Sequence, residues 1–395
     1  MGLGQQDQIQ HLRRLLRTGR SASGSAEKSH QSESLGEAPV HADDVLHHVD
    51  TVLNRLPPDE VGDPAEFKLA LQILMAHAEP ALRKVLAPQA PKILVPDEAA
   101  ALEALIIPDG SRPSFLLYDG QIKADHPFLG IWKDEMVCFG HTLRKLAAAV
   151  GRIQVPNGGP HNYSGTGTLV GEKLVLTNLH VVNHARNELG VGMCPQGDGL
   201  LNVFGDWVID FVGESGTATC NQWRIKQVRV PKGAGEIFAG LDAAVLCIEP
   251  YNEQKTADLP TPVKLSADID YATGSASPSF ATIGFPGWPK TTGPKAVTVD
   301  WDFVIKKLFN ERFGLKRVAP GKVLHPIGSV AESGHVLTHD ATTFGGASGS
   351  LLFAWKNDDS PAFALHFAGA TLTANYAVSL HKVADALRAI GLDIH

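Results

Sequence analysis

The feature that most constrains the fold is a long stretch, from about residue 152 to about residue 380, in which short apolar runs alternate with turn residues. The runs are rich in β-branched residues, and clusters of Gly, Pro, Asn and Asp separate them. Many short strands of this kind are typical of β-sandwiches and barrels. The chain also has 39 Gly and 25 Pro residues, 64 of 395 in all, which favours a turn-rich β body over a helical bundle. Examples of the runs are TLVGEKLVLT, RIKQVRV, AAVLCI, FATIGF, AVTVDWDFVI and SLLFAW.

The chain before residue 150 has a different texture, in which helical periodicity dominates. Apolar residues at helical spacing predict a helix over residues 42–56, which Pro57-Pro58 ends. Residues 63–66 (Asp-Pro-Ala-Glu) then supply an N-cap, a proline at the first helical position and an acid at the third. The helix that they begin runs towards Pro80, with a further turn to Leu86.

Shorter elements complete this outline. Residues 114–122 predict a strand interrupted by an Asp-Gly turn. We expect further helices over residues 97–105, 134–149 and 381–390.

These elements divide the chain into four parts. Residues 1–40 include a small, polar stretch with almost nothing to bury, which predicts a disordered tether. A helical module follows at 41–90, then a connecting α/β segment at 91–150. Residues 151–395 form the β-rich domain, which ends in a helix.

Composition and charge exclude several classes of function. The net charge is −7, from 35 basic and 42 acidic residues, which argues against a nucleic-acid partner. The four cysteines are scattered and none forms a CxxC pair, so we expect neither a disulfide framework nor a structural zinc site. No run approaches the roughly 18 apolar residues of a membrane span, and the first residues lack the apolar core of a secretory signal. We therefore expect a cytoplasmic protein without a membrane partner.

The histidines show no spacing suited to a metal. His335 and His339 would need a helix to face each other, but their segment predicts a strand. We expect them to be solvated or hydrogen-bonded polar residues, and we expect no metal and no cofactor.

Three segments of the β-rich region carry chemistry. The first segment, SGTGTLVG followed by LVLTNLHVV, contains His180. The second, GLDAAVL, contains Asp242, and the third, TTFGGASGSLLF, contains Ser348. A serine hydroxyl needs a base to become a nucleophile, and a tight Gly-Gly-x-Ser-Gly loop lets backbone N–H groups converge on one point. Each segment alone is more often structural: a histidine at a strand end, a turn aspartate, a glycine-rich hairpin loop.

Together, the three segments occur in the order His, Asp, Ser, with intervals of 62 and 106 residues. This arrangement resembles the trypsin-like (chymotrypsin-fold) serine peptidases over about residues 150–395. The resemblance implies a mainly β fold of two six-stranded barrels with the site between them. It implies that Ser348 is the nucleophile, His180 the general base and then acid, and Asp242 the residue that orients the imidazole. The N–H groups of Gly346 and Ser348 would form the oxyanion hole, and the substrate would be a protein or peptide.

Two positions depart from the secreted trypsins. The residue before the serine is Ala347, where those enzymes carry an aspartate that pairs with a newly cut N-terminus. The residue after His180 is Val181 instead of a cysteine. Both resemble the bacterial-type branch, and we do not expect activation by a liberated amine.

The same resemblance places a specificity pocket. Its positions here are Thr342, Thr343 and the strand residues His366, Phe367, Ala368 and Gly369, and none of them is acidic. Threonine with His366 resembles the glutamyl endopeptidases, in which imidazole and hydroxyl groups bind a substrate carboxylate. If His366 carries charge there, the preference for acidic residues would weaken as the pH rises past ~6.5. The alternative is a core histidine and a small or apolar pocket formed by Phe367 and Ala368.

The N-terminal module also has two interpretations. In size, position and helicity, residues 41–90 resemble the small effector-associated adaptor domains fused to trypsin-like peptidases in bacterial conflict systems. This resemblance implies an adaptor or effector partner and a role in bacterial defence or regulation; a helical cap packed on the barrels is the alternative. The chain as a whole could likewise be a catalytically weak adaptor that acts through this module, although the complete set of three segments favours an active serine endopeptidase.

Overall fold

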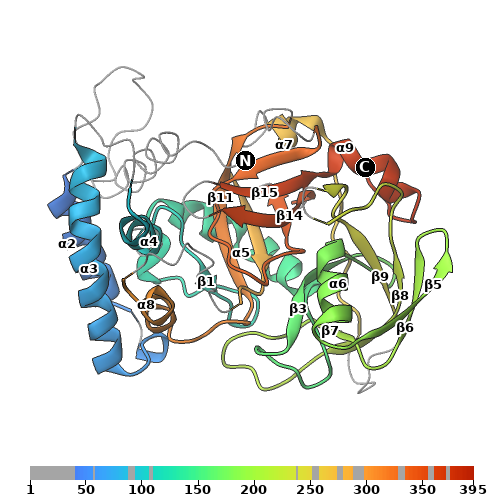
Figure 1. Cartoon of the computed structure of the whole chain (residues 1–395), viewed down its shortest axis with the longest axis horizontal. Coiled ribbons are helices and arrows are strands. Elements are labelled where there is room, and N and C mark those ends of the chain that lie inside the picture. Colours follow the sequence, from blue (N-terminus) through green and yellow to red (C-terminus); the bar gives the residue numbers. More distant parts are fainter. Residues whose placement is uncertain are drawn as a thin grey trace.

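The computed structural model describes residues 41–56, 58–87, 94–105, 110–236, 239–250, 258–273, 279–287, 298–327, 334–354, 360–370 and 374–395. The expected tether at 1–40 lies outside these residues. Figure 1 shows two β-barrels side by side, with the first helices at one end of the molecule.

The middle of the chain forms the first barrel. Its antiparallel sheet has the order β5-β6-β8-β7-β2-β3-β4-β9, and pairing of β8 with β9 closes six of the strands into a barrel. The β5–β6 hairpin extends from β8 outside the closed ring. The strands are β2 (Val150–Gln154), β3 (Tyr163–Gly171), β4 (Leu174–Thr177), β5 (Gly192–Gly197), β6 (Leu200–Phe204), β7 (Val208–Asp210), β8 (Gln222–Arg229) and β9 (Ala244–Ile248).

The last third of the chain forms the second barrel. Its antiparallel sheet has the order β1-β11-β10-β13-β14-β15-β12, and pairing of β11 with β12 closes six strands. The expected mainly β, chymotrypsin-like double barrel with N-terminal helices is confirmed. The strands are β1 (Phe115–Leu116), β10 (Ser279–Gly284), β11 (Arg317–His325), β12 (Val336–His339), β13 (Leu351–Ala354), β14 (Ala362–Ala370) and β15 (Ala374–Ser379).

Apolar side chains from most of the predicted runs fill both barrels. The run AVTVDWDFVI is an exception, because its residues 301–305 form part of helix α8 (Trp301–Leu308) and not a strand. Each buried aliphatic or aromatic side chain contributes about 1.5–3 kcal/mol relative to exposure, so these interiors hold the strand ends that carry the site in place. Buried residues of the first barrel include Ile153, Leu169, Val175, Ile209, Ile225 and Val245, and those of the second include Phe280, Leu337, Leu352, Phe363 and Ala377. Three helices accompany the barrels: α6 (Leu179–Asn187), α7 (Ile269–Thr273) and α9 (Leu380–Arg388).

The N-terminal helices pack against an insertion of the second barrel. They are α2 (Ala42–Leu53), the 3₁₀ turn η1 (Pro58–Glu60), α3 (Pro64–Leu86) and α4 (Pro96–Leu105), and the insertion helix is α8 (Trp301–Leu308). Figure 1 shows α3 running beside α4 and α8. The His77 ring meets the Trp301 ring edge-on at 5.8 Å, and the Trp301 Nε1–H donates to Asp97 Oδ1 at 2.9 Å.

The start of α3 is the one that the sequence predicts. The Asp63 side chain accepts hydrogen bonds from the N–H groups of Ala65 and Glu66, with Pro64 at the first helical position. The helix continues through Pro80 and ends at Leu86, the residue at which the sequence predicts its last turn.

The connecting segment joins both barrels. Asp119 and Gly120 both have positive φ (51° and 69°), as the predicted two-residue turn requires. β1 pairs with β11, and α5 (Lys133–Ala149) leads directly into β2. The 3₁₀ helix η2 (Pro127–Trp132) precedes α5.

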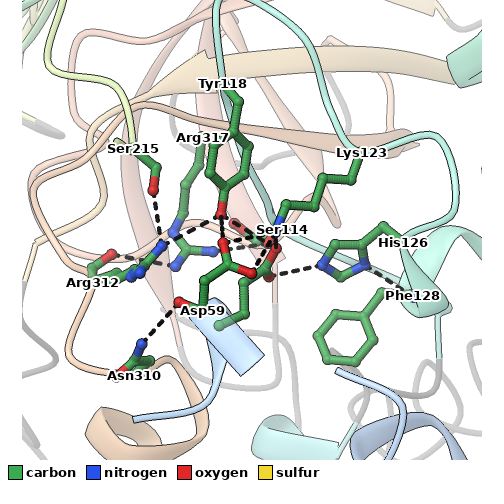
Figure 2. Close-up of polar contacts among 11 residues, drawn as sticks. Asp59, Ser114, Tyr118, Lys123, His126, Phe128, Ser215, Asn310, Arg312 and Arg317 are labelled. Carbon is green, nitrogen blue, oxygen red and sulfur yellow. Dashed lines mark hydrogen bonds and ion pairs between the residues drawn. The ribbon is translucent and has the colours of Figure 1, made fainter. Parts of the chain in front are cut away.

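A cluster of charged side chains fastens η1 to this segment and to the second barrel (Figure 2). Lys123 Nζ donates to both Asp59 carboxylate oxygens, at 2.9 and 2.8 Å, and lies 3.2 Å from Glu60 Oε1. His126 Nε2 lies 3.0 Å from Glu60 Oε2. We call Asp59, Glu60, Lys123 and His126 the η1 cluster.

No helix in the described part of the chain is both long enough and apolar enough to span a membrane.

Candidate active site

His180 and Asp242, which are 62 residues apart in the sequence, lie side by side in the first barrel. β4 leads into α6, which carries His180 in its first turn, and Asp242 lies two residues before β9, the strand that pairs with β4. His180 Nδ1 is 2.6 Å from Asp242 Oδ2. An ionised carboxylate only accepts hydrogen bonds, so Nδ1 carries the proton and the other ring nitrogen, Nε2, is left to accept one.

The backbone holds this pair in one orientation. The N–H of His180 donates to Asp242 Oδ1 at 3.0 Å, and the Asn178 side chain donates to the Asp242 carbonyl at 2.8 Å. Asp242 is fully buried, whereas the His180 side chain keeps 21% of its exposure. A buried carboxylate behind a partly exposed imidazole is the arrangement that a general base requires.

Ser348 lies on the tight loop between β12 and β13 of the second barrel. Gly346 and Gly349 have φ values of 89° and 91°, which favour glycine. The N–H groups of Ala347, Gly349 and Ser350 donate to backbone carbonyls, whereas those of Gly346 and Ser348 make no hydrogen bond with any described residue. Two unpaired backbone donors two residues apart are what an oxyanion hole needs.

The loop reaches the first barrel beside the histidine. The N–H of Thr166 in β3 donates to the Ser348 carbonyl at 2.9 Å. A Cβ added to Gly165 would lie 3.0 Å from that carbonyl oxygen and 2.7 Å from Val181, the neighbour of His180. Within the described structure no hydrogen bond joins the Ser348 hydroxyl to His180; such bonds often tighten only in the substrate complex.

The expected pocket residues differ in whether their polar groups are already bonded within the protein. The Thr342 hydroxyl donates to the Arg112 carbonyl at 2.6 Å, so it stabilises the fold and is not available to a substrate. The Thr343 hydroxyl faces β14, where a Cβ on Gly369 would lie 3.9 Å from it. Phe367 is buried and packs near Tyr376, and Ala368 is half-buried.

His366 has a partner that the sequence analysis did not identify. It is buried, and its Nδ1 lies 3.1 Å from Nε2 of His339 on β12, inside the second barrel. Burial, together with the electrostatic interaction with nearby His180, lowers the pKa of His366 to about 3, and a hydrogen bond with the Tyr376 backbone does not outweigh them. His366 is therefore neutral in the free enzyme near pH 6.5, so the condition for a weakening of acidic preference at that pH, a charged His366, is not met there. Burial, together with His366, also lowers the pKa of His339 well below its usual value.

Other site types are not visible in the described residues. No group of three or more His, Cys, Asp or Glu side chains there is arranged to hold a metal ion. All four cysteines lie in the described part of the chain, and none of them forms a disulfide there.

The two barrels, with a His–Asp pair and a glycine-rich serine loop at their junction, define a chymotrypsin-like serine peptidase scaffold. The trypsin-like peptidase domain matches residues 165–358. A probable serine protease from Lysobacter enzymogenes is 44% identical over 392 residues, which cover 98% of this chain and 99% of the relative. The chain belongs to the trypsin-like serine peptidase family.

Proposed function

We propose that the chain is a serine endopeptidase that uses Ser348, His180 and Asp242. The observation that carries the proposal is the 2.6 Å contact from His180 to a buried Asp242, beside a serine loop with two unpaired N–H donors. In the first step His180 Nε2 takes the Ser348 proton while Oγ attacks the carbonyl carbon of the substrate. The oxyanion accepts hydrogen bonds from the N–H groups of Gly346 and Ser348.

The second half of the reaction reuses the same groups. The protonated His180 gives its proton to the leaving amine, and the acyl group stays on Ser348 Oγ. Water then loses a proton to His180 and attacks the ester, which releases the carboxylate product and restores the serine. Asp242 stays ionised and stabilises the imidazolium in both halves.

Peptide hydrolysis by three variants tests this assignment. Ser348→Ala should lower kcat by about 10⁴-fold or more, because no nucleophile remains. Asp242→Asn should lower it by about 10⁴-fold, because His180 loses its fixed tautomer. Cys138→Ser, a change at an exposed thiol far from the site in the sequence, is the control. Hydrolysis that persists in Ser348→Ala would exclude the assignment.

We also propose that the enzyme prefers an acidic residue, most favourably Glu, before the scissile bond. Thr343 and His366 support this, because a hydroxyl and an imidazole N–H can both donate to a carboxylate and no acid lies among the pocket positions.

Matched peptides with Glu, Gln, Ala or Leu before the cleaved bond test this preference. Glu should be cleaved best, and Thr343→Val should lower kcat/KM for Glu peptides more than for Ala peptides, because the carboxylate loses a donor. Since His366 is neutral in the free enzyme, it should give no inflection in kcat/KM between pH 5 and 8. Equal or better cleavage of the Leu or Ala peptide would show an apolar pocket instead.

A further inference from the structure

We propose that Thr166 is a positioning residue that holds the Gly346–Ser348 loop with both of its free N–H groups turned towards the substrate. Thr166 would thereby replace the ion pair that an aspartate at position 347 would supply. The inference rests on the proposed peptidase function and adds to it a residue of the first barrel that controls the geometry of a loop in the second.

The hydrogen bonds of the Thr166 hydroxyl have only one consistent direction. Its Oγ1 lies 3.1 Å from the N–H of Phe285 and 2.9 Å from the carbonyl of Gly346. The N–H can only donate, so Oγ1 accepts there and its single proton goes to the Gly346 carbonyl. Thr166 is fully buried, which removes water as a competing partner.

The backbone of Thr166 fixes the same loop at a second point. Its N–H donates to the Ser348 carbonyl at 2.9 Å, and its own carbonyl accepts from Thr177 Oγ1 at 2.7 Å. A Cβ on Gly349 would lie 1.9 Å from the Thr166 carbonyl oxygen, so the loop lies directly against β3. One residue therefore binds the carbonyls of both residues whose N–H groups form the proposed oxyanion hole.

The peptide before Gly346 is also held. Its carbonyl, that of Gly345, accepts a hydrogen bond from the N–H of Gly287. In a planar trans peptide the C=O and the following N–H point in opposite directions, so the Gly346 N–H faces away from Gly287. Tyr163 lies directly against this loop, because a Cβ at Gly346 would lie 2.5 Å from its Oη, which donates to the Phe285 carbonyl.

These contacts take the place of an ionic anchor. Ala347 is buried with 3% exposure and has no side chain that could pair with an amine. The buried Arg112–Asp340 ion pair holds only the start of the loop. Around residues 344–350 the hydrogen bonds of the described structure join neutral groups, and the Thr166 hydroxyl is the side-chain donor to a carbonyl there.

Three variants on the same strand test the inference. Thr166→Val removes the hydroxyl and keeps the shape, and Thr166→Ser keeps the hydroxyl. Thr168→Val is the matched control, because Thr168 is equally buried on β3 and its hydroxyl has no hydrogen-bond partner in the described structure. We expect Thr166→Val to lower kcat by about 10- to 100-fold, below the loss from removing an oxyanion donor outright, with KM changed less than about threefold. Thr166→Ser should restore kcat, and Thr168→Val should leave it unchanged.

A transition-state mimic separates positioning from general destabilisation. A peptide aldehyde, which forms an oxyanion on Ser348, should bind Thr166→Val about 10-fold or more weakly, whereas the cleaved product peptide should bind it as it binds the wild type. If Thr166→Val does not fold, as judged by its Tm, the variant Thr166→Cys is used instead. Its thiol is similar in size to the hydroxyl but is a poorer hydrogen-bond donor. Wild-type kcat in a folded Thr166→Val, or in the substitute Thr166→Cys, overturns the inference. A wild-type enzyme that neither cleaves peptides nor binds the aldehyde would instead refute the proposed function.

Discussion

His339 and His366 form a buried pair of imidazoles whose protonation opposes folding. Burial lowers the pKa of both groups, and that of His366 falls to about 3. In the unfolded chain each would titrate near ~6.5. Between these two values the unfolded state binds more protons than the folded state, so the free energy of unfolding rises with pH over that range.

We therefore predict that acid destabilises the protein through this pair. From pH 6.5 downwards each imidazole should cost up to about 1.4 kcal/mol of stability per pH unit. His339→Gln, which cannot titrate, should lose less stability than the wild type when the pH falls from 7.5 to 5. Thermal unfolding at the two pH values measures this, and an equal decrease of Tm in both proteins would contradict it.

The two pocket threonines should behave differently when mutated. Thr342→Val removes a hydrogen bond to Arg112 and should lower the free energy of unfolding by about 1 kcal/mol without changing the preference between Glu and Ala peptides. Thr343→Val should change that preference with little loss of stability. Denaturant unfolding and kcat/KM for the two peptides should be measured on both variants. A loss of peptide preference in Thr342→Val, or a loss of stability alone in Thr343→Val, would contradict these roles.

Single residues could be predicted from the sequence where they belong to a local pattern. His180, Asp242 and the Ser348 loop each lie at a strand end or in a glycine turn. Their order along the chain resembles that of the trypsin-like peptidases, and this resemblance implied their roles. The pairing of His339 with His366 could not be predicted, because it depends on the register of β12, β15 and β14 across the second barrel. Thr166 lies inside the SGTGTLVG segment, but its hydrogen-bond partner Gly346 is 180 residues away, so its contact with the serine loop could not be predicted either.

At the scale of elements, the η1 cluster connects the first helices to the rest of the chain. Burial alone would raise the pKa of Glu60, but the hydrogen bonds and charges of His126 and Lys123 outweigh it and lower the pKa to about 2. The shift from the ordinary 4.5 corresponds to roughly 3 kcal/mol of stability. Because the folded pKa lies below the unfolded one, this contribution is present above pH 4.5 and is lost as the pH falls towards 2.

We predict that Glu60→Gln loosens η1 while the barrels stay folded. Hydrogen exchange of the η1 and α2 amides should become faster, whereas exchange in β9 and β13 should not change. Asp50→Asn, an acid on the adjacent helix α2, is the control. Unchanged exchange in η1 would show that the cluster contributes nothing to docking.

Most elements were predictable, and the exceptions have a physical reason. Caps and turns, such as Asp63 at the start of α3 and Asp119-Gly120, act locally and are visible in the sequence. The run AVTVDWDFVI was expected to be a strand, but its residues 301–305 lie in helix α8. α3 continues past Pro80, although a proline disfavours a helix interior. A buried face that includes Phe67, Leu74 and Leu82 lies on both sides of this residue, and its packing outweighs one missing backbone donor.

At the scale of the whole molecule, the N-terminal helices cover α8, the insertion helix of the second barrel. Trp301 of α8 is buried with 1% exposure and contacts His77 of α3 and Asp97 of α4. Lys307 of α8 pairs with Glu66 of α3 at 2.7 Å. These contacts favour a packed cap over a freely separable module, and recruitment of a partner through residues 41–90 stays a prediction.

Deletion of residues 1–90 tests this interpretation. We expect the truncated chain to unfold at a lower temperature and to bind a hydrophobic dye, because the α8 surface that α3 covers becomes exposed. An unchanged Tm together with unchanged peptide hydrolysis would instead show that the helices are a separable module. The strand pattern predicted a β-rich domain and the resemblance to the trypsin-like peptidases implied its two barrels. This docking was not predictable, because it joins segments more than 200 residues apart.

The central claim is that Ser348 is a nucleophile activated by His180. The most direct test is covalent labelling by a fluorophosphonate, followed by mass spectrometry of the digested protein. We predict one phosphonyl adduct, on the peptide that contains Ser348, which forms far more slowly in His180→Ala and is absent in Ser348→Ala. An adduct on another residue, or labelling that is equally fast in His180→Ala, would contradict this account.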